Sequence, residues 1–131
     1  MTIYLTAEQI LFIHYRLVDE TGGEHGLRDL GMLESAAARP RQTFDNQELY
    51  TDIFEKAAAL MESLVNNHPF IDGNKRTGIA GTVLFIRQNG FTFAARNSEL
   101  EKFTLRVASS KIKHAGIAQW LIKHSLPLKA S

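Results

Sequence analysis

The sequence predicts an all-α protein in which about six helices pack around a buried central helix, with one small β-hairpin added. Apolar residues recur at three- and four-residue spacing through most of the chain, and capping residues and glycines divide it into segments of helical length. Between the second and third predicted helices, Pro40 to Tyr50 lacks helical periodicity. With 131 residues, 44% of them hydrophobic, we expect one compact domain spanning residues 1–131.

The first helix has clear signals at both ends. Thr6, with Gln9 three residues later, forms a capping box, and Gly22-Gly23 ends the helix. Its apolar stripe is formed by Ile10, Ile13 and Leu17. Asp29 can cap a short second helix that ends near Ala38.

A hairpin is expected after the second helix. Residues 43–47 read Thr-Phe-Asp-Asn-Gln, which places Asp45-Asn46 at a tight turn. The alternative is a plain connecting loop. The third helix begins at about Thr51 and runs into His68. Its apolar positions are Ile53, Ala57, Leu60, Met61 and Leu64.

The fourth helix is predicted to be the buried central one, because it is apolar nearly all round. It starts at Asn74 as N-cap and stops at Gly90. Gly78 and Gly81 are unfavourable in a helix unless another helix crosses closely there. The apolar positions are Ile79, Ala80, Val83, Leu84, Phe85 and Ile86.

Two shorter helices complete the prediction. Ser98 with Glu101 caps the fifth helix. Ile117, Trp120 and Leu121 mark the sixth, and Trp120 is expected to be a core residue. His14 and His124 are expected to be structural, and Arg28-Asp29 to be a surface ion pair and an N-cap.

Residues 68–77, His-Pro-Phe-Ile-Asp-Gly-Asn-Lys-Arg-Thr, carry the strongest chemical signal. Lys75 and Arg76 would lie in the first turn of the fourth helix, where the macrodipole disfavours each cation by about 0.3–1 kcal/mol. A bound phosphate would reverse this effect by accepting the free N–H groups and pairing with both side chains. The pattern therefore predicts a phosphate site at this turn.

Four neighbours of that turn complete the predicted site. Asp72 is placed to hold Mg²⁺ together with substrate phosphates and water. A histidine such as His68 can accept a proton near neutral pH and so activate a hydroxyl. Phe70 should face inward, and Pro69 should keep His68 in extended geometry. Taken singly, each residue also has an ordinary reading as a turn or a solvated surface.

The run His-Pro-Phe-x-Asp-Gly-Asn-Lys-Arg resembles the core motif of the Fic family, and more closely its death-on-curing (Doc) branch. The similarity extends from Leu5 to about Ser125 and includes residues 26–31 and 41–44. It implies a Fic-type helical bundle. It also implies that His68 is the base for a target hydroxyl, that Asp72 holds Mg²⁺, and that nucleotide phosphates bind Gly73, Asn74 and Arg76.

The resemblance also bears on the reaction. Fic adenylyltransferases usually have glycine at the position of Lys75 and a second arginine at that of Ile79. The Doc-like residues here imply an inverted ATP and transfer of its terminal phosphate to a Thr or Ser hydroxyl, with elongation factor Tu as the implied target and translation inhibition as the result. Pro69 and Gly73 are similar to ordinary Fic loops, so AMP transfer stays open as the alternative.

In Fic relatives, a flap before the motif helix aligns the target chain by backbone pairing. We expect the same role for residues Gln42, Thr43, Phe44, Asp45, Asn46 and Gln47. Many Fic proteins also carry an inhibitory helix in which glutamate precedes glycine or asparagine, and no glutamate here does so. If the protein is a toxin, the absence of this inhibitory helix implies that a separate small antitoxin inhibits it. We expect a disordered segment of that antitoxin to fold on binding.

Composition excludes several other classes. Net charge is +1, from 15 basic and 14 acidic residues, which argues against direct nucleic-acid binding. No apolar run reaches the roughly 18 residues of a membrane span, and the start resembles no export signal. The absence of cysteine fits a cytoplasmic protein. A non-catalytic phosphate-binding module remains the alternative from another class, although it would need neither His68 nor Asp72.

Overall fold

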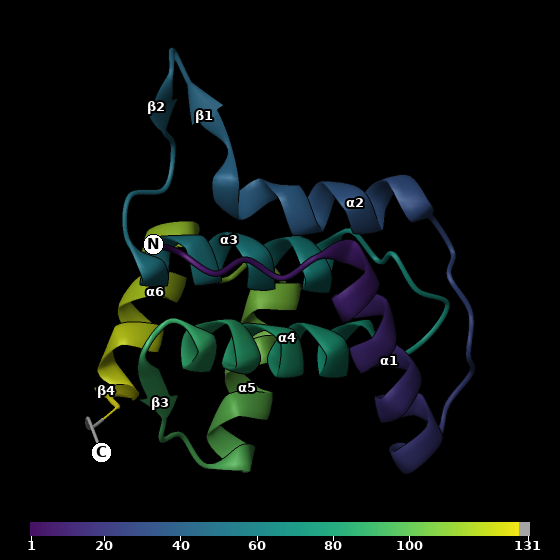
Figure 1. The fold of residues 1–131 in the computed structure, drawn as a ribbon. Helices are drawn as coiled ribbons and strands as arrows, with labels where there is room; N and C mark the ends of the chain where they lie inside the picture. The colour runs from purple at the N-terminus through teal and green to yellow at the C-terminus, as the bar shows by residue number, and fades with distance from the viewer. Residues whose placement is uncertain (129–131) are drawn as a thin grey trace.

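The computed structural model describes residues 1–128, so residues 129–131 of the expected domain lie outside the described part (Figure 1). Helices dominate the fold, and the prediction of an all-α protein is confirmed. The helices are α1 (Ala7–Thr21), α2 (Leu30–Ala38), the 3-10 turn η1 (Arg39–Arg41), α3 (Ile53–Asn66), α4 (Asn74–Gln88), α5 (Asn97–Ala108) and α6 (His114–Lys123). The strands are β1 (Thr43–Phe44), β2 (Gln47–Glu48), β3 (Phe91–Phe93) and β4 (Ser125–Pro127).

Helices α3 and α4 pack side by side at the centre (Figure 1). The predicted close crossing is confirmed, because a Cβ on Gly78 would lie 2.7 Å from Val65 Cγ2. A Cβ on Gly81 would lie 3.3 Å from Leu64 Cδ1. The helix that is most deeply buried differs from the predicted one, however. Helix α3 contributes nine buried residues and α4 six, so α3 is the deeper helix, since α4 keeps one side partly open.

Local capping signals are confirmed at the first two helices. Thr6 Oγ1 accepts from the backbone of Gln9 at 3.1 Å, and the Gln9 side chain accepts from the backbone of Thr6 at 2.9 Å. Asp29 Oδ1 accepts from Met32 N at 3.0 Å and caps α2. These interactions need only residues three apart, which is why the sequence alone predicts them.

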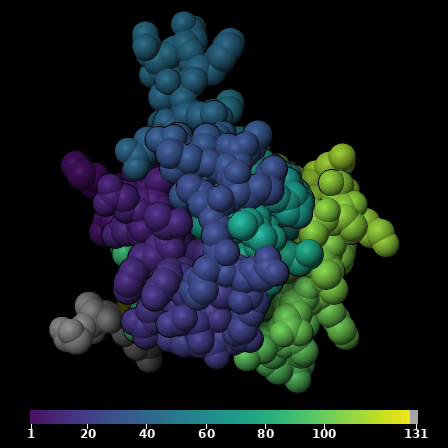
Figure 2. Space-filling view, turned by 90° about the vertical axis from the view of Figure 1, so that its right-hand side faces the viewer, coloured from purple at the N-terminus to yellow at the C-terminus, as the bar shows by residue number. Residues whose placement is uncertain are grey.

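The predicted hairpin is also confirmed. Strands β1 and β2 pair antiparallel, with Thr43 opposite Glu48 and Phe44 opposite Gln47. The turn residues Asp45 and Asn46 have φ angles of 54° and 64°, as the hairpin turn requires. The hairpin projects from the body of the protein (Figures 1 and 2).

The start of α4 differs from the prediction. Gly73, with φ 77°, is the N-cap, and Asn74 is the first helical residue. The side chain of Asn74 turns back to Phe70, accepting from its backbone N–H and donating to its carbonyl oxygen, each at 2.9 Å. Asn74 therefore closes the motif loop instead of capping the helix.

The geometry of His68 was predicted wrongly. Helix α3 ends at Asn66, and His68 has φ 49°, which is left-handed and not extended. The preference imposed by Pro69 is overridden by a distant side chain, because Arg28 Nε donates to His68 O at 2.6 Å and Arg28 Nη2 to Asn67 O at 2.8 Å.

The C-terminal part contains one correction and one unpredicted feature. Helix α5 is capped by Arg96, whose N–H donates to Glu99 at 3.4 Å, so Ser98 and Glu101 are not the capping pair. Strands β3 and β4 form a second small antiparallel sheet that the sequence reading missed. Trp120 is half-buried and stacks on buried Phe103 with ring centroids 3.9 Å apart, so it packs against the core.

The order of the elements places two features at opposite ends of α3. The hairpin precedes its first turn, and the loop of residues 68–73 follows its last (Figure 1). Within residues 1–128, no helix combines the length and apolarity needed to cross a membrane.

Candidate functional site

The motif residues surround one pocket of about 460 Å³. It opens where the loop after α3 meets the first turn of α4. The pocket is lined by His68, Ile71, Asp72, Gly73, Asn74, Lys75 and Arg76. The structure therefore brings together the residues predicted for base, metal and phosphate roles. Figure 2 views the molecule from this end of α3, and the teal surface of this part of the chain is exposed in the middle of that face.

Backbone contacts to the segment before α2 hold the loop in place. Pro69 O accepts from Arg28 N at 2.8 Å and from Asp29 N at 3.0 Å, and Ile71 N donates to Gly26 O at 3.1 Å. Together with the Arg28 side chain, these contacts fix the backbone at His68. The imidazole is exposed and belongs to the pocket wall, so it can reach a bound hydroxyl.

A stacked pair of rings supports the loop from below. Phe70 is 1% exposed, which confirms that it faces inward, and its ring lies parallel to that of His14 at 3.8 Å. His14 is also buried and donates from Nε2 to Asp72 O at 2.7 Å. Burial lowers the pKa of His14, which favours the neutral ring that makes this contact.

The carboxylate of Asp72 is exposed and ionised. Its Oδ2 accepts from Glu24 N at 3.1 Å and its Oδ1 from Gly73 N at 2.8 Å. These two backbone hydrogen bonds, with the charge of Arg76, lower the pKa of Asp72. Each oxygen can accept a further contact, and Asp72 lines the pocket, so this residue fits a Mg²⁺ ligand. Within residues 1–128, no group of three or more acidic or histidine side chains gathers as a metal cage, so further ligands would come from phosphates and water.

The first turn of α4 presents both predicted cations and unpaired N–H groups. Thr77 N donates to Gly73 O, whereas the N–H groups of Asn74, Lys75 and Arg76 meet no acceptor within residues 1–128. Arg76 Nη1 donates to the hydroxyl of Thr21 and, at 2.9 Å, to Gly22 O. The end of α1 therefore orients this guanidinium, and its Nε and Nη2 groups remain for a phosphate.

The hairpin does not lie at this pocket. Lys56, which contacts the hairpin base, and Asn66, the last residue of α3, are ten positions apart, or about 15 Å along the helix at its usual rise per residue. Residues 42–47 are therefore near the opposite end of α3 from His68.

Two residues that support the site were missed in the sequence. The structural role expected of His14 is confirmed by its burial, but its contact with the motif loop was not predicted. Arg28 was interpreted as part of a surface ion pair, yet it also holds that loop. Their partners lie 58 and 40 positions away, so no local pattern reveals these contacts. The resemblance of residues 26–31 to the Fic family was the available signal for Arg28.

Comparison with known proteins agrees with the motif. The model of the Fic/DOC family matches residues 4–86. "Toxin Doc" of Mycolicibacterium smegmatis (strain ATCC 700084 / mc(2)155) is 42% identical over 95 residues, which cover 72% of this chain and 71% of that protein. "Protein kinase doc" of Escherichia phage P1 is 29% identical over 118 residues, covering 90% of this chain and 92% of that protein.

The fold and the pocket define the class: an all-α protein with a Fic-type motif loop between two packed central helices. The chain belongs to the Fic/DOC family, and its named relatives place it in the Doc branch.

Proposed function

We propose that this protein is a toxin-like transferase that uses ATP and Mg²⁺ to phosphorylate a Thr or Ser hydroxyl of a target protein, with elongation factor Tu as the candidate target. The observation that carries the proposal is one pocket lined by His68 and residues 72–76 in a chain of the Doc branch. The name of one relative, "Protein kinase doc", supports this reaction class.

His68 is the proposed general base. Its imidazole takes the proton of the acceptor hydroxyl as the hydroxyl oxygen forms a bond to the γ-phosphorus of ATP. The bond between that phosphorus and the bridging oxygen to the β-phosphate breaks, and ADP leaves. Because Arg28 fixes the loop backbone at His68, the position from which the imidazole projects does not depend on the substrate.

The remaining pocket residues stabilise phosphate charge. Free N–H groups of the first turn of α4, the ammonium of Lys75 and the oriented guanidinium of Arg76 all face phosphate oxygens in this proposal. Mg²⁺ held by Asp72 would neutralise charge on the β- and γ-phosphates. No protein nucleophile is required, because phosphoryl transfer depends chiefly on position and electrostatics.

The same pocket supports AMP transfer as the second candidate. Lys75 favours the phosphoryl reaction, because it lines the pocket as a charged side chain and takes up space there. We therefore expect the γ-phosphate, and not the α-phosphate, to lie beside His68.

Intact-mass spectrometry distinguishes these reactions. Purified elongation factor Tu is incubated with this protein, ATP and Mg²⁺, and we expect a gain of one phosphate that is abolished by chelating Mg²⁺. A gain of one AMP would replace the proposal by adenylylation. ATP binding without any mass change would support the non-catalytic binding module, once lysate proteins had also been found unmodified.

We also propose a small antitoxin as partner. One relative is named "Toxin Doc", and no glutamate in this chain forms the glutamate-glycine or glutamate-asparagine pair expected of an inhibitory helix. Expression of the protein alone should therefore arrest growth, and co-expression of the antitoxin should restore it. Normal growth of cells that contain active, uninhibited protein would contradict this part of the proposal.

The hairpin is the proposed contact for the protein target. Its two strands pair only with each other among residues 1–128, which leaves outer edges free for an added strand. Because the hairpin lies at the other end of α3 from His68, it would bind the target at a distance from the modified hydroxyl. A folded protein can span both places, whereas a short peptide would engage the pocket alone.

A further inference from the structure

Lys56 is a charged residue in the hydrophobic core. It is 1% exposed and is one of the largest fully buried side chains among the described residues. Burying an ammonium group costs several kcal/mol unless it is well paired, and an apolar side chain of similar size often gives equal or greater stability. Stability alone therefore does not account for a lysine at this position of α3.

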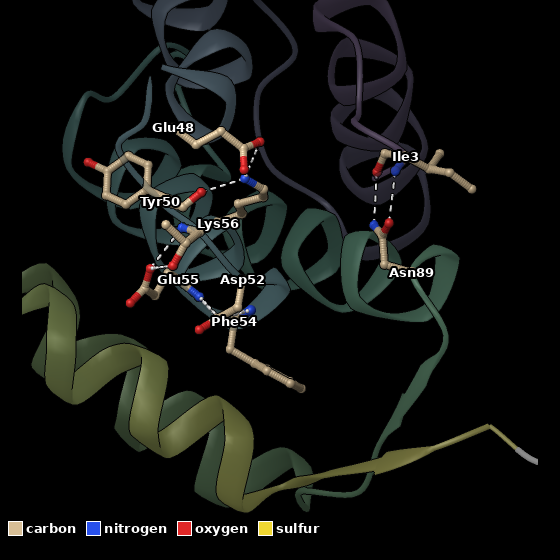
Figure 3. Close-up of polar contacts among 9 residues, drawn as sticks. Ile3, Glu48, Tyr50, Asp52, Phe54, Glu55, Lys56 and Asn89 are labelled. Carbon is tan, nitrogen blue, oxygen red and sulfur yellow. Dashed lines mark hydrogen bonds and ion pairs between the residues drawn. The ribbon is translucent and has the colours of Figure 1, made fainter. Parts of the chain in front are cut away.

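The hydrogen-bond partners of Lys56 lie in β2 and in the residues directly after it (Figure 3). Its Nζ donates to Tyr50 O at 2.5 Å and pairs with Glu48 Oε1 at 3.1 Å. The ring of Tyr4 lies 5.9 Å from the same nitrogen. Within residues 1–128, Nζ has no hydrogen-bond partner on any helix, so its burial is satisfied only when β2 and Tyr50 stay where they are.

The first turn of α3, which carries Lys56, is held by capping hydrogen bonds. Asp52 Oδ1 accepts from the N–H groups of Phe54 and Glu55, each at 2.9 Å, and Glu55 Oε2 accepts from Thr51 N at 2.9 Å (Figure 3). The ammonium therefore projects from a capped helix and not from a fraying end.

A second cation holds the other side of the hairpin base. Arg39, directly before the hairpin segment, donates from Nε to the hydroxyl of Tyr50 at 3.1 Å and pairs with Glu62 at 2.7 Å. Leu49 N donates to Gln42 O at 2.9 Å and joins the two residues that flank the hairpin strands. A hairpin with two residues in each strand is marginal by itself, so these anchors supply its rigidity.

We infer that Lys56 is a positioning residue whose buried ammonium holds the β1–β2 hairpin in place, so that the hairpin can contact the protein target. Phe44 on the hairpin is 79% exposed and Leu49 is 51% exposed, so both side chains are accessible to a target protein. The docking role rests on the proposed transferase function. The mechanical role of Lys56 does not, because it follows from the contacts of the free protein.

The test compares Lys56→Met and Glu48→Ala with the wild type. The Glu48 side chain is half exposed, so Glu48→Ala removes no packed side chain from the core and gives a second variant should Lys56→Met fail to fold. Arg16→Ala is the matched control, since it removes an exposed ion pair with Glu20 on α1. Hydrogen exchange of residues 42–49 is measured on the free protein, and KM for elongation factor Tu, kcat and the Kd of ATP are measured alongside.

We expect exchange in the hairpin to rise about tenfold in either variant and not in Arg16→Ala. KM for elongation factor Tu should rise about tenfold, while kcat and the Kd of ATP stay within about twofold, because the pocket lies at the other end of α3. Combining both substitutions should add little to Lys56→Met, since the two residues act through one contact.

Unchanged hairpin exchange in both variants would overturn the inference, as would faster exchange with an unchanged KM for elongation factor Tu. A fall in kcat together with weaker ATP binding would also overturn it, because that pattern indicates general loss of structure. If the wild type leaves elongation factor Tu unmodified, the proposed target is wrong, and hairpin exchange in the free protein still decides the role of Lys56.

Discussion

Replacing His68 with asparagine should lower the rate of phosphoryl transfer by about 10²- to 10⁴-fold, the usual contribution of a general base. Asparagine is preferred to alanine as the replacement because His68 has φ 49°, a left-handed conformation that asparagine tolerates and alanine does not favour. Loop geometry should survive, since Arg28 holds the backbone oxygen at this position and not the imidazole. The Kd of ATP should stay within about twofold, because phosphates bind the turn and not the base.

Single-turnover transfer, followed by intact mass, checks this expectation. His25→Asn is a suitable control, because His25 is also an exposed histidine and pairs with Asp19 instead of lining the pocket. Transfer by His68→Asn within threefold of the wild-type rate would remove His68 as the base. Loss of ATP binding in the variant would instead show that His68 supports the nucleotide site.

How much of this architecture could be predicted depends on the sequence distance between interacting groups. The capping box at Thr6 and the turn at Asp45-Asn46 use neighbours only, and both were predicted correctly. The pairing of β3 with β4 joins Phe91 to Pro127, and no local pattern in either strand indicates its partner.

The candidate site follows the same division. The chemistry of His68 and Asp72 is visible in ten consecutive residues, and the structure places both at one pocket. Asn74 was misread because an N-cap and a loop-closing amide use the same residue type, and only the contact with Phe70 distinguishes them. Arg28 was underestimated because its hydrogen bonds to the motif loop cross about forty positions of the chain.

Replacing Phe70 with alanine should lower the free energy of unfolding by about 3–5 kcal/mol, the usual cost of truncating a buried phenylalanine. The ring is 1% exposed and stacked on His14, so its loss leaves a cavity directly beneath the motif loop. For a domain of this size the melting temperature should fall by roughly 10–20 °C. Urea denaturation at fixed pH measures the free energy, and differential scanning calorimetry the melting temperature.

The location of that cavity gives Phe70 an influence on catalysis beyond stability. His14 links the Phe70 ring to Asp72 O, and Asn74 links the Phe70 backbone to the start of α4. A loosened loop would therefore displace both the carboxylate of Asp72 and the phosphate-binding turn. At a temperature where Phe70→Ala remains folded, kcat should still fall and the Mg²⁺ requirement should rise. Phe44→Ala, at an exposed position, should change stability by no more than about 0.5 kcal/mol. Wild-type kcat in folded Phe70→Ala would show that the loop keeps its shape through the backbone contacts of Gly26 and Arg28 alone.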